Sequence, residues 1–261
     1  MAKKTIILST LLLCLLFLRS GYVHAELVVH WTFDDGTAQD KAAAGVTLNG
    51  IIPGGSYTPT YLSTGGINGS GAFRFDGSDD FLTPSFVYDM GNGDWSVSFW
   101  IKTSDTSTYY GYEGTPAVSV IGDTTNAVGF GVGIEGGKAT LTHFYSGWRT
   151  ISGSTNVANN IGHYLTFIHH SVGKVDIYVD GNAEILGAAS YDGQYAYVIR
   201  DIGRSYDPKY ANMTLDDFRI YNHALSSTEV SQFVVGVPEP TSLIALLMAL
   251  CFFYLGRKNT K

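Results

Sequence analysis

Hydrophobic and polar residues alternate in short runs along most of the chain. The clearest runs cover residues 27–33, 95–101, 128–134, 138–144, 164–168, 175–179 and 215–221. A period of two is typical of a β-strand with one buried face. Glycine, aspartate and asparagine interrupt the runs at residues 76–77, 135–137, 172–174 and 180–182, where they predict turns. The pattern predicts an all-β domain, an antiparallel sandwich or barrel.

Between the two ends of the chain, only residues 225–233 predict a helix, and the C-terminal apolar segment predicts a further, hydrophobic one. Ser226 stands three residues before Glu229, the spacing of a capping box, and Val230 and Phe233 supply an apolar face. The helix would close the domain, and residues 234–240 would form a linker.

A G-x-G-x-x-G pattern at residues 131–136 has a nucleotide-binding and a structural interpretation. Pyrophosphate binding requires a helix after the glycines, but the alternating residues 138–144 follow them. The pattern therefore predicts a hairpin.

The amino end has the features of a signal peptide spanning residues 1–25. Lys3 and Lys4 precede an apolar run at residues 5–18, and cleavage is expected after Ala25. Cys14 follows Leu13, not the small residue usual before a lipoprotein cysteine. The chain is therefore expected to be exported after cutting by a signal peptidase.

The carboxyl end has three parts. Pro238, Glu239 and Pro240 keep the linker extended, and thirteen apolar residues follow at 243–255. As a helix these residues span roughly 20 Å, which is shorter than a ~30 Å hydrocarbon core. Arg257, Lys258 and Lys261 end the chain and would hold that end in the cytoplasm. Residues 241–261 therefore predict a transmembrane segment.

This tail resembles the PEP-CTERM sorting signal. The resemblance implies recognition and cleavage by an exosortase of an exopolysaccharide-producing Gram-negative bacterium. It implies an inner-membrane intermediate and then a place at the cell surface or in the extracellular matrix. An ordinary tail anchor that is never removed stays as the alternative.

Removal of both ends changes the charge and the cysteine content. Cys14 and Cys251 lie in the ends, so the exported domain has no disulfide. It keeps 10 basic residues against 23 acidic ones, a net charge of −13. Nucleic acid is excluded as a partner because phosphate binding requires a basic surface.

Five segments of residues 26–233 resemble the LamG-like, concanavalin A-like family. They are WTFDD at 31–35, FRFDGSDDF at 73–81, WSVSFWIK at 95–102, IYVDG at 177–181 and LDDFRIYNHAL at 215–225. The resemblance implies a two-sheet antiparallel jelly-roll sandwich. It also implies a structural calcium ion held by Asp34 and Asp216, with Asp76 as a further candidate ligand in a group with Asp79 and Asp80.

Neighbouring aspartates do not by themselves make a calcium site. Side chains alternate along a strand, so Asp216 and Asp217 are expected to face opposite sides, and only one can be a ligand. Aspartates are also common at turns that hold no metal.

Glycan binding is favoured over catalysis. The family's glycosidases carry a Glu-x-Asp-x-x-Glu pattern, and no glutamate here has an aspartate two residues later. Tyrosines and a tryptophan gather in Gly-bearing loops and at a turn, where they offer flat faces with polar handles; the candidates are Tyr109, Tyr110, Tyr145 and Trp148. We therefore expect a non-catalytic protein that binds glycans or exopolysaccharide. A purely structural matrix protein and a divergent glycoside hydrolase are the alternatives.

Overall fold

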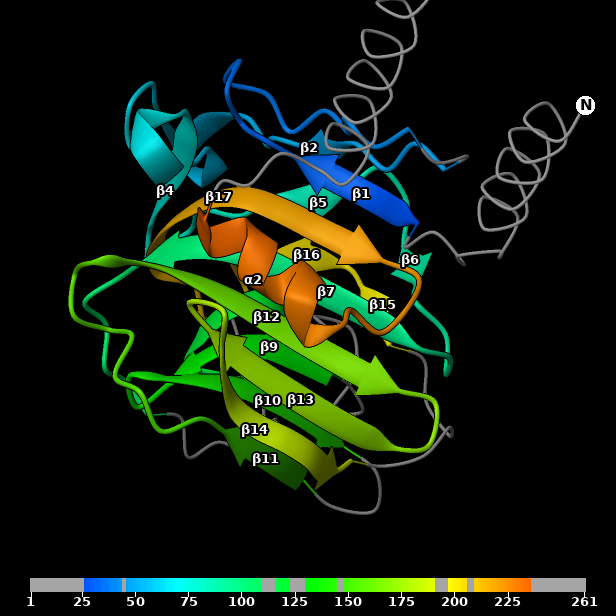
Figure 1. The fold of residues 1–261 in the computed structure, drawn as a ribbon. Coiled ribbons are helices and arrows are strands. Elements are labelled where there is room, and N and C mark those ends of the chain that lie inside the picture. The colour runs from blue at the N-terminus through cyan, green and yellow to red at the C-terminus, as the bar shows by residue number, and fades with distance from the viewer. Residues whose placement is uncertain are drawn as a thin grey trace, which may run out of the picture.

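The domain is a sandwich of two antiparallel sheets (Figure 1). A computed structural model describes residues 26–43, 46–108, 116–122, 130–144, 148–190, 197–205 and 209–235. The signal peptide with Ala25, and the sorting segment with Pro238, Glu239 and Pro240, lie outside these ranges. Within them no helix is long and apolar enough to cross a membrane.

The larger sheet has eight strands. Seven follow the order β14-β13-β12-β7-β17-β4-β3, and β1 pairs with β17. Their bounds are β1 Leu27–Trp31, β3 Thr60–Leu62, β4 Ala72–Asp76, β7 Trp95–Lys102, β12 Gly162–His170, β13 Lys174–Val179, β14 Asn182–Ala189 and β17 Asn212–Tyr221. The predicted runs at residues 27–33, 95–101, 164–168, 175–179 and 215–221 all fall on strands of this sheet.

The smaller sheet has five strands in the order β11-β10-β9-β8-β16. They are β8 Val118–Gly122, β9 Phe130–Glu135, β10 Lys138–Phe144, β11 Trp148–Ser152 and β16 Asp201–Ile202. Lys138 pairs with Glu135 across a tight turn, so the G-x-G-x-x-G residues form a hairpin as predicted. The described connections also contain two two-stranded ribbons and two short helices. The ribbons are β2 Gly50–Ile51 with β5 Thr83–Pro84 and β6 Tyr88–Asp89 with β15 Val198–Ile199, and the helices are η1 Gly55–Tyr57 and η2 Ile67–Gly69.

Alternate side chains of each long strand fill the space between the sheets. Along β7, Trp95, Val97, Phe99 and Ile101 enter the core, whereas Ser98 lies on the outer face and hydrogen-bonds Thr166 of β12 at 2.8 Å. Trp95 meets Phe130 of the opposite sheet with ring centroids 5.3 Å apart. Burial of this one apolar layer fixes which face of each strand points inward.

Helix α2, Ser227–Val235, covers the outer face of the larger sheet (Figure 1). The Ser226 amide donates to Glu229 Oε2 at 2.7 Å, and the Glu229 amide donates to Ser226 Oγ at 3.3 Å, which confirms the capping box. Val230 and Phe233 pack against Ile168, Tyr178 and Tyr221. The helix therefore ties the end of the domain to β12, β13 and β17.

Candidate functional site

The two adjacent aspartates of β17 lie at a β-bulge. Asp216 pairs with Trp100 of β7 but Arg219 pairs with Ser98, so β17 carries one extra residue there, and Asp217 has a φ of 49°. Leu215 and Phe218 consequently both face the core although they are three residues apart. The expectation that Asp216 and Asp217 face opposite sides of a regular strand is therefore wrong, because the bulge interrupts the alternation.

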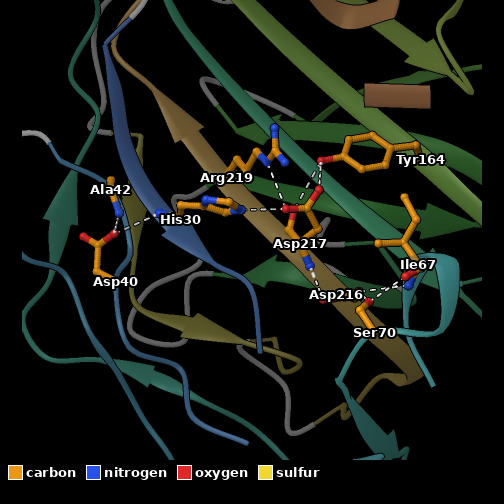
Figure 2. Close-up of polar contacts among 9 residues, drawn as sticks. All are labelled: His30, Asp40, Ala42, Ile67, Ser70, Tyr164, Asp216, Asp217 and Arg219. Atoms are coloured by element: carbon orange, nitrogen blue, oxygen red, sulfur yellow. Dashed lines mark hydrogen bonds and ion pairs between the residues drawn. The ribbon is translucent and has the colours of Figure 1, made fainter. Parts of the chain in front are cut away.

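Asp216 holds the turn that contains η2 (Figure 2). Its Oδ2 accepts hydrogen bonds from the Ile67 amide at 2.9 Å and the Ser70 hydroxyl at 2.6 Å, and its Oδ1 accepts the Asp217 amide at 2.6 Å. Only 1% of Asp216 is exposed. Burial raises its pKa to about 6, although the hydrogen bonds from Ser70 and Ile67 act in the opposite direction.

Gly66 allows this turn to approach Asp216. A Cβ at residue 66 would lie 2.2 Å from Asp216 Oδ2 and 2.6 Å from the Gly71 carbonyl oxygen. A larger residue would push the turn off the carboxylate.

Asp217 forms the centre of a second network (Figure 2). His30 Nε2 of β1 lies 2.6 Å from Asp217 Oδ1, Arg219 Nε donates to the same oxygen at 2.9 Å, and the Tyr164 hydroxyl of β12 donates to Oδ2 at 2.8 Å. Burial opposes ionisation of Asp217, but the hydrogen bond from His30 and the charge of Arg219 outweigh it and lower the pKa to about 2. The guanidinium of Arg219 also lies 5.0 Å from the ring centroid of Phe233 in α2. One carboxylate therefore links β1, β17, β12 and α2.

Calcium at Asp34 and Asp216 stays a prediction. The ion requires six to eight oxygen ligands, and three N–H and O–H donors of the protein already contact the two oxygens of Asp216. The Asp34 side chain is exposed, and its carbonyl oxygen accepts the Tyr61 hydroxyl at 2.6 Å. In the described part of the chain, neither residue belongs to a group of three or more candidate metal ligands.

Asp76, the third candidate ligand, lies elsewhere. With Asp79 and Asp80 it forms the single such group among the described residues, its ligand oxygens within 4.8 Å of one another. The same carboxylates also close a turn: Asp76 Oδ1 accepts the Ser78 amide at 2.7 Å, and Asp80 Oδ2 accepts the Asp76 amide at 2.9 Å. Calcium at this group stays a prediction.

The aromatic candidates are largely outside the described residues. This applies to Tyr109, Tyr110 and Tyr145, and for Trp148 the backbone alone is placed, at the start of β11. Their role in binding stays a prediction.

Tyr57, Phe81 and Arg204 form a cluster of two aromatic rings and a guanidinium that sequence reasoning missed. The Tyr57 and Phe81 ring centroids are 5.9 Å apart, and Arg204 Cζ lies 3.7 Å from the Phe81 centroid. These residues are up to 147 positions apart and share no motif. The pairing of Leu82 with Ile202 brings them together, and no local sequence signal predicts that bridge.

A family model supports the fold assignment. Residues 75–231 match the model described as the concanavalin A-like lectin/glucanases superfamily. The chain belongs to that superfamily. No curated protein sequence matches the chain.

Solved structures share the fold of this superfamily member. Domain 4 of the arabinanase AbnA from Geobacillus stearothermophilus, in complex with arabinotriose, has a TM-score of 0.58 and 20% identity, over 80% of this chain and 98% of that one. The receptor-binding domain of botulinum neurotoxin type G has a TM-score of 0.56 and 18% identity, over 80% and 51%. The binding domain of botulinum neurotoxin DC in complex with SialylT has a TM-score of 0.57 and 16% identity, over 80% and 50%. The chain thus spans about half the length of the toxin domains.

Replacement of Asp217 by Asn should lower the free energy of unfolding by about 2 to 3 kcal/mol at neutral pH, because Arg219 and Tyr164 lose a buried charged acceptor. The folded pKa of Asp217, about 2, lies below the ordinary value of 3.8. Its stabilisation is therefore complete above about pH 4 and is lost as the pH falls towards 2. Urea unfolding of both proteins across this range measures the difference, which should shrink with acid.

Asp35→Asn is the control, since Asp35 pairs with Lys41 at 2.9 Å on the exposed surface and should contribute little. If Asp217→Asn were as mild as Asp35→Asn, Asp217 would not hold the four elements together.

Replacement of Asp216 by Asn should lower the melting temperature equally in excess calcium and in EDTA. The amide cannot accept from all three donors, at a cost of about 1 to 3 kcal/mol, and this cost does not involve calcium. Asp76→Asn is the comparison: any calcium-dependent stabilisation that it removes belongs to the Asp76, Asp79 and Asp80 group. A loss in Asp216→Asn that disappears in EDTA would show that Asp216 is a calcium ligand.

Proposed function

We propose that the chain is an exported, non-catalytic protein that binds glycans or matrix components at the cell surface or in an exopolysaccharide layer. The observation that carries the proposal is membership of a superfamily of lectins and glucanases. Two proteins of the same fold support it, because their structures hold arabinotriose and SialylT. A glycan is accordingly the partner that we propose.

The described glutamates favour a lectin over a glucanase. A retaining glycosidase needs two carboxyl groups about 5 to 5.5 Å apart that can reach a sugar. Glu135 instead accepts the Ala117 amide at 2.7 Å, and Glu26 accepts the Asn222 side chain at 2.8 Å. Glu229 caps α2, and Glu184 accepts the Ser154 amide at 2.7 Å. Each described glutamate thus has a structural partner.

The aspartate pair of β17 also lacks the properties of a catalytic pair. The different pKa values of Asp216 and Asp217 resemble those of an acid and a base in an active site. However, Asp216 is buried and both carboxylates are held by protein donors. A substrate would have to break these hydrogen bonds before it met either group.

Delivery is the second part of the proposal. Residues 1–25 would be removed by a signal peptidase, and an exosortase would cut near the Pro238-Glu239-Pro240 motif after residues 241–261 had entered the inner membrane. The order of motif, apolar run and basic end supports this proposal.

Protein purified from its host should bind to a glycan array or to host exopolysaccharide and should release no reducing sugar. Tyr110→Ala and Trp148→Ala should each weaken the retention on exopolysaccharide if these aromatic residues contact the sugar. Reducing sugar that disappears on a single carboxylate substitution would favour a divergent glycoside hydrolase. Absence of binding to any glycan would favour a purely structural matrix protein.

Mass spectrometry of the protein from its host should find an amino terminus at Glu26 and a carboxyl terminus upstream of Leu243. A mature protein that ends at Lys261 would contradict exosortase processing and favour a permanent tail anchor.

A further inference from the structure

Three segments that are distant in the sequence meet at one place on the described surface of the domain and form a candidate ligand-binding surface there. Tyr57 belongs to η1, Phe81 precedes β5, and Arg204 follows β16. The Phe81 amide donates to the Tyr57 carbonyl at 3.4 Å, and Leu82 and Ile202 exchange two hydrogen bonds of 2.9 Å. These backbone contacts place Tyr57, Phe81 and Arg204 side by side. We call these three residues the Tyr57 platform.

Arg204 is held in a fixed position on this platform. Its Cζ lies 3.7 Å from the Phe81 ring centroid, and its Nη2 donates to Asp201 Oδ1 at 2.9 Å. Asp201 is itself buried and accepts the Thr83 hydroxyl at 3.3 Å. Because the planar guanidinium is stacked and paired, it loses little further freedom when it binds a ligand. About 29% of the Arg204 side chain stays exposed, so N–H donors remain available to a ligand.

Tyr57 supplies the flat face. It is 47% exposed, and its ring is inclined at 60° to Phe81, which supports it from one side. Its hydroxyl forms no hydrogen bond with any residue that the structure describes. An isolated exposed tyrosine is ordinary on a protein surface. This one differs because Phe81, the ring that supports it, also carries a fixed guanidinium. The cluster thus combines an apolar face, a hydroxyl group and a guanidinium, the groups by which a protein recognises the C–H face and the hydroxyl groups of a sugar.

The charges around the platform select the class of sugar. Asp201 neutralises Arg204, and the Asp76, Asp79 and Asp80 group directly precedes Phe81 in the chain. A uronate or sialate carboxylate would meet these acids and find no uncompensated cation among the four platform and partner residues. The hydroxyl groups of a neutral sugar need no such cation and can accept from the exposed part of the Arg204 guanidinium. We infer that the Tyr57 platform binds neutral sugars of a glycan, an inference that rests on the proposed glycan-binding function and gives it a site.

The test measures binding of the full-length protein to arabinotriose, cellotetraose and trigalacturonate by titration calorimetry and saturation-transfer NMR. Tyr57→Ala and Arg204→Lys should each weaken binding of a neutral oligosaccharide up to about tenfold, the size of one aromatic or bidentate contact. Tyr57→Phe keeps the ring and should retain most of the affinity. Phe86→Ala is the matched control, because Phe86 is also 47% exposed and is not one of the three residues of the platform. Melting curves of all four variants confirm that they fold.

The outcomes separate this inference from the function on which it rests. If the wild type binds neutral oligosaccharides and Tyr57→Ala and Arg204→Lys bind them equally well, the platform is overturned and the proposed function stands. If only trigalacturonate binds and the same variants lose it, the assignment to neutral sugars is overturned. If the wild type binds none of the three and no glycan on an array, both proposals fail.

Discussion

The placement of strand β17 depends on one inserted residue, Asp217. Before the bulge β17 pairs with β4 through residues 212–215, and after it β17 pairs with β1 through residues 218–221, while β7 lies along its other edge. The bulge therefore lies where the neighbouring strand changes. A regular strand would turn Phe218 out of the core, because Leu215 already points inward and the side-chain period is two. The bulge keeps both residues buried.

A buried bulge leaves backbone and charged groups that need hydrogen-bond partners. The carboxylates of Asp216 and Asp217 are the acceptors that these groups find. Asp216 accepts the amide of Asp217 together with donors from the η2 turn, and Asp217 collects His30, Arg219 and Tyr164. The cost of burying each carboxylate is met differently: hydrogen bonds offset it only in part for Asp216, whose pKa stays raised, whereas hydrogen bonds and a cation outweigh it for Asp217. Protein contacts therefore hold the fold at this point, whether or not Asp216 also binds a cation.

The elements of the fold that could be predicted are those with a local sequence pattern, either alternating apolar and polar residues or turn residues. The alternation of apolar and polar residues predicted strands β7, β12, β13 and β17. Asp180 and Gly181 have a positive φ, as expected for the turn predicted at residues 180–182. Strand β14 was not predicted, because it is an edge strand of mostly small residues, NAEILGAA, without buried alternation. The bulge carries no glycine signal, since aspartate itself takes the left-handed φ. The Tyr57 platform depends on the bridge between Leu82 and Ile202, which are 120 residues apart, and such a tertiary contact has no local pattern.

If both ends are removed as proposed, the charge of the remaining domain bears on which polysaccharides it can approach. A net charge of −13 after loss of the basic ends repels acidic polymers at long range, although salt shortens that range to about 8 Å in physiological solution. The proposed removal of Arg257, Lys258 and Lys261 with the tail would increase this repulsion. A domain delivered in this form is suited to contacts with little net charge, such as an aromatic face and a paired guanidinium. Under the proposed function, the acidic charge that would keep the domain soluble outside the cell and the pairing of Arg204 with Asp201 both favour a neutral glycan over an acidic one.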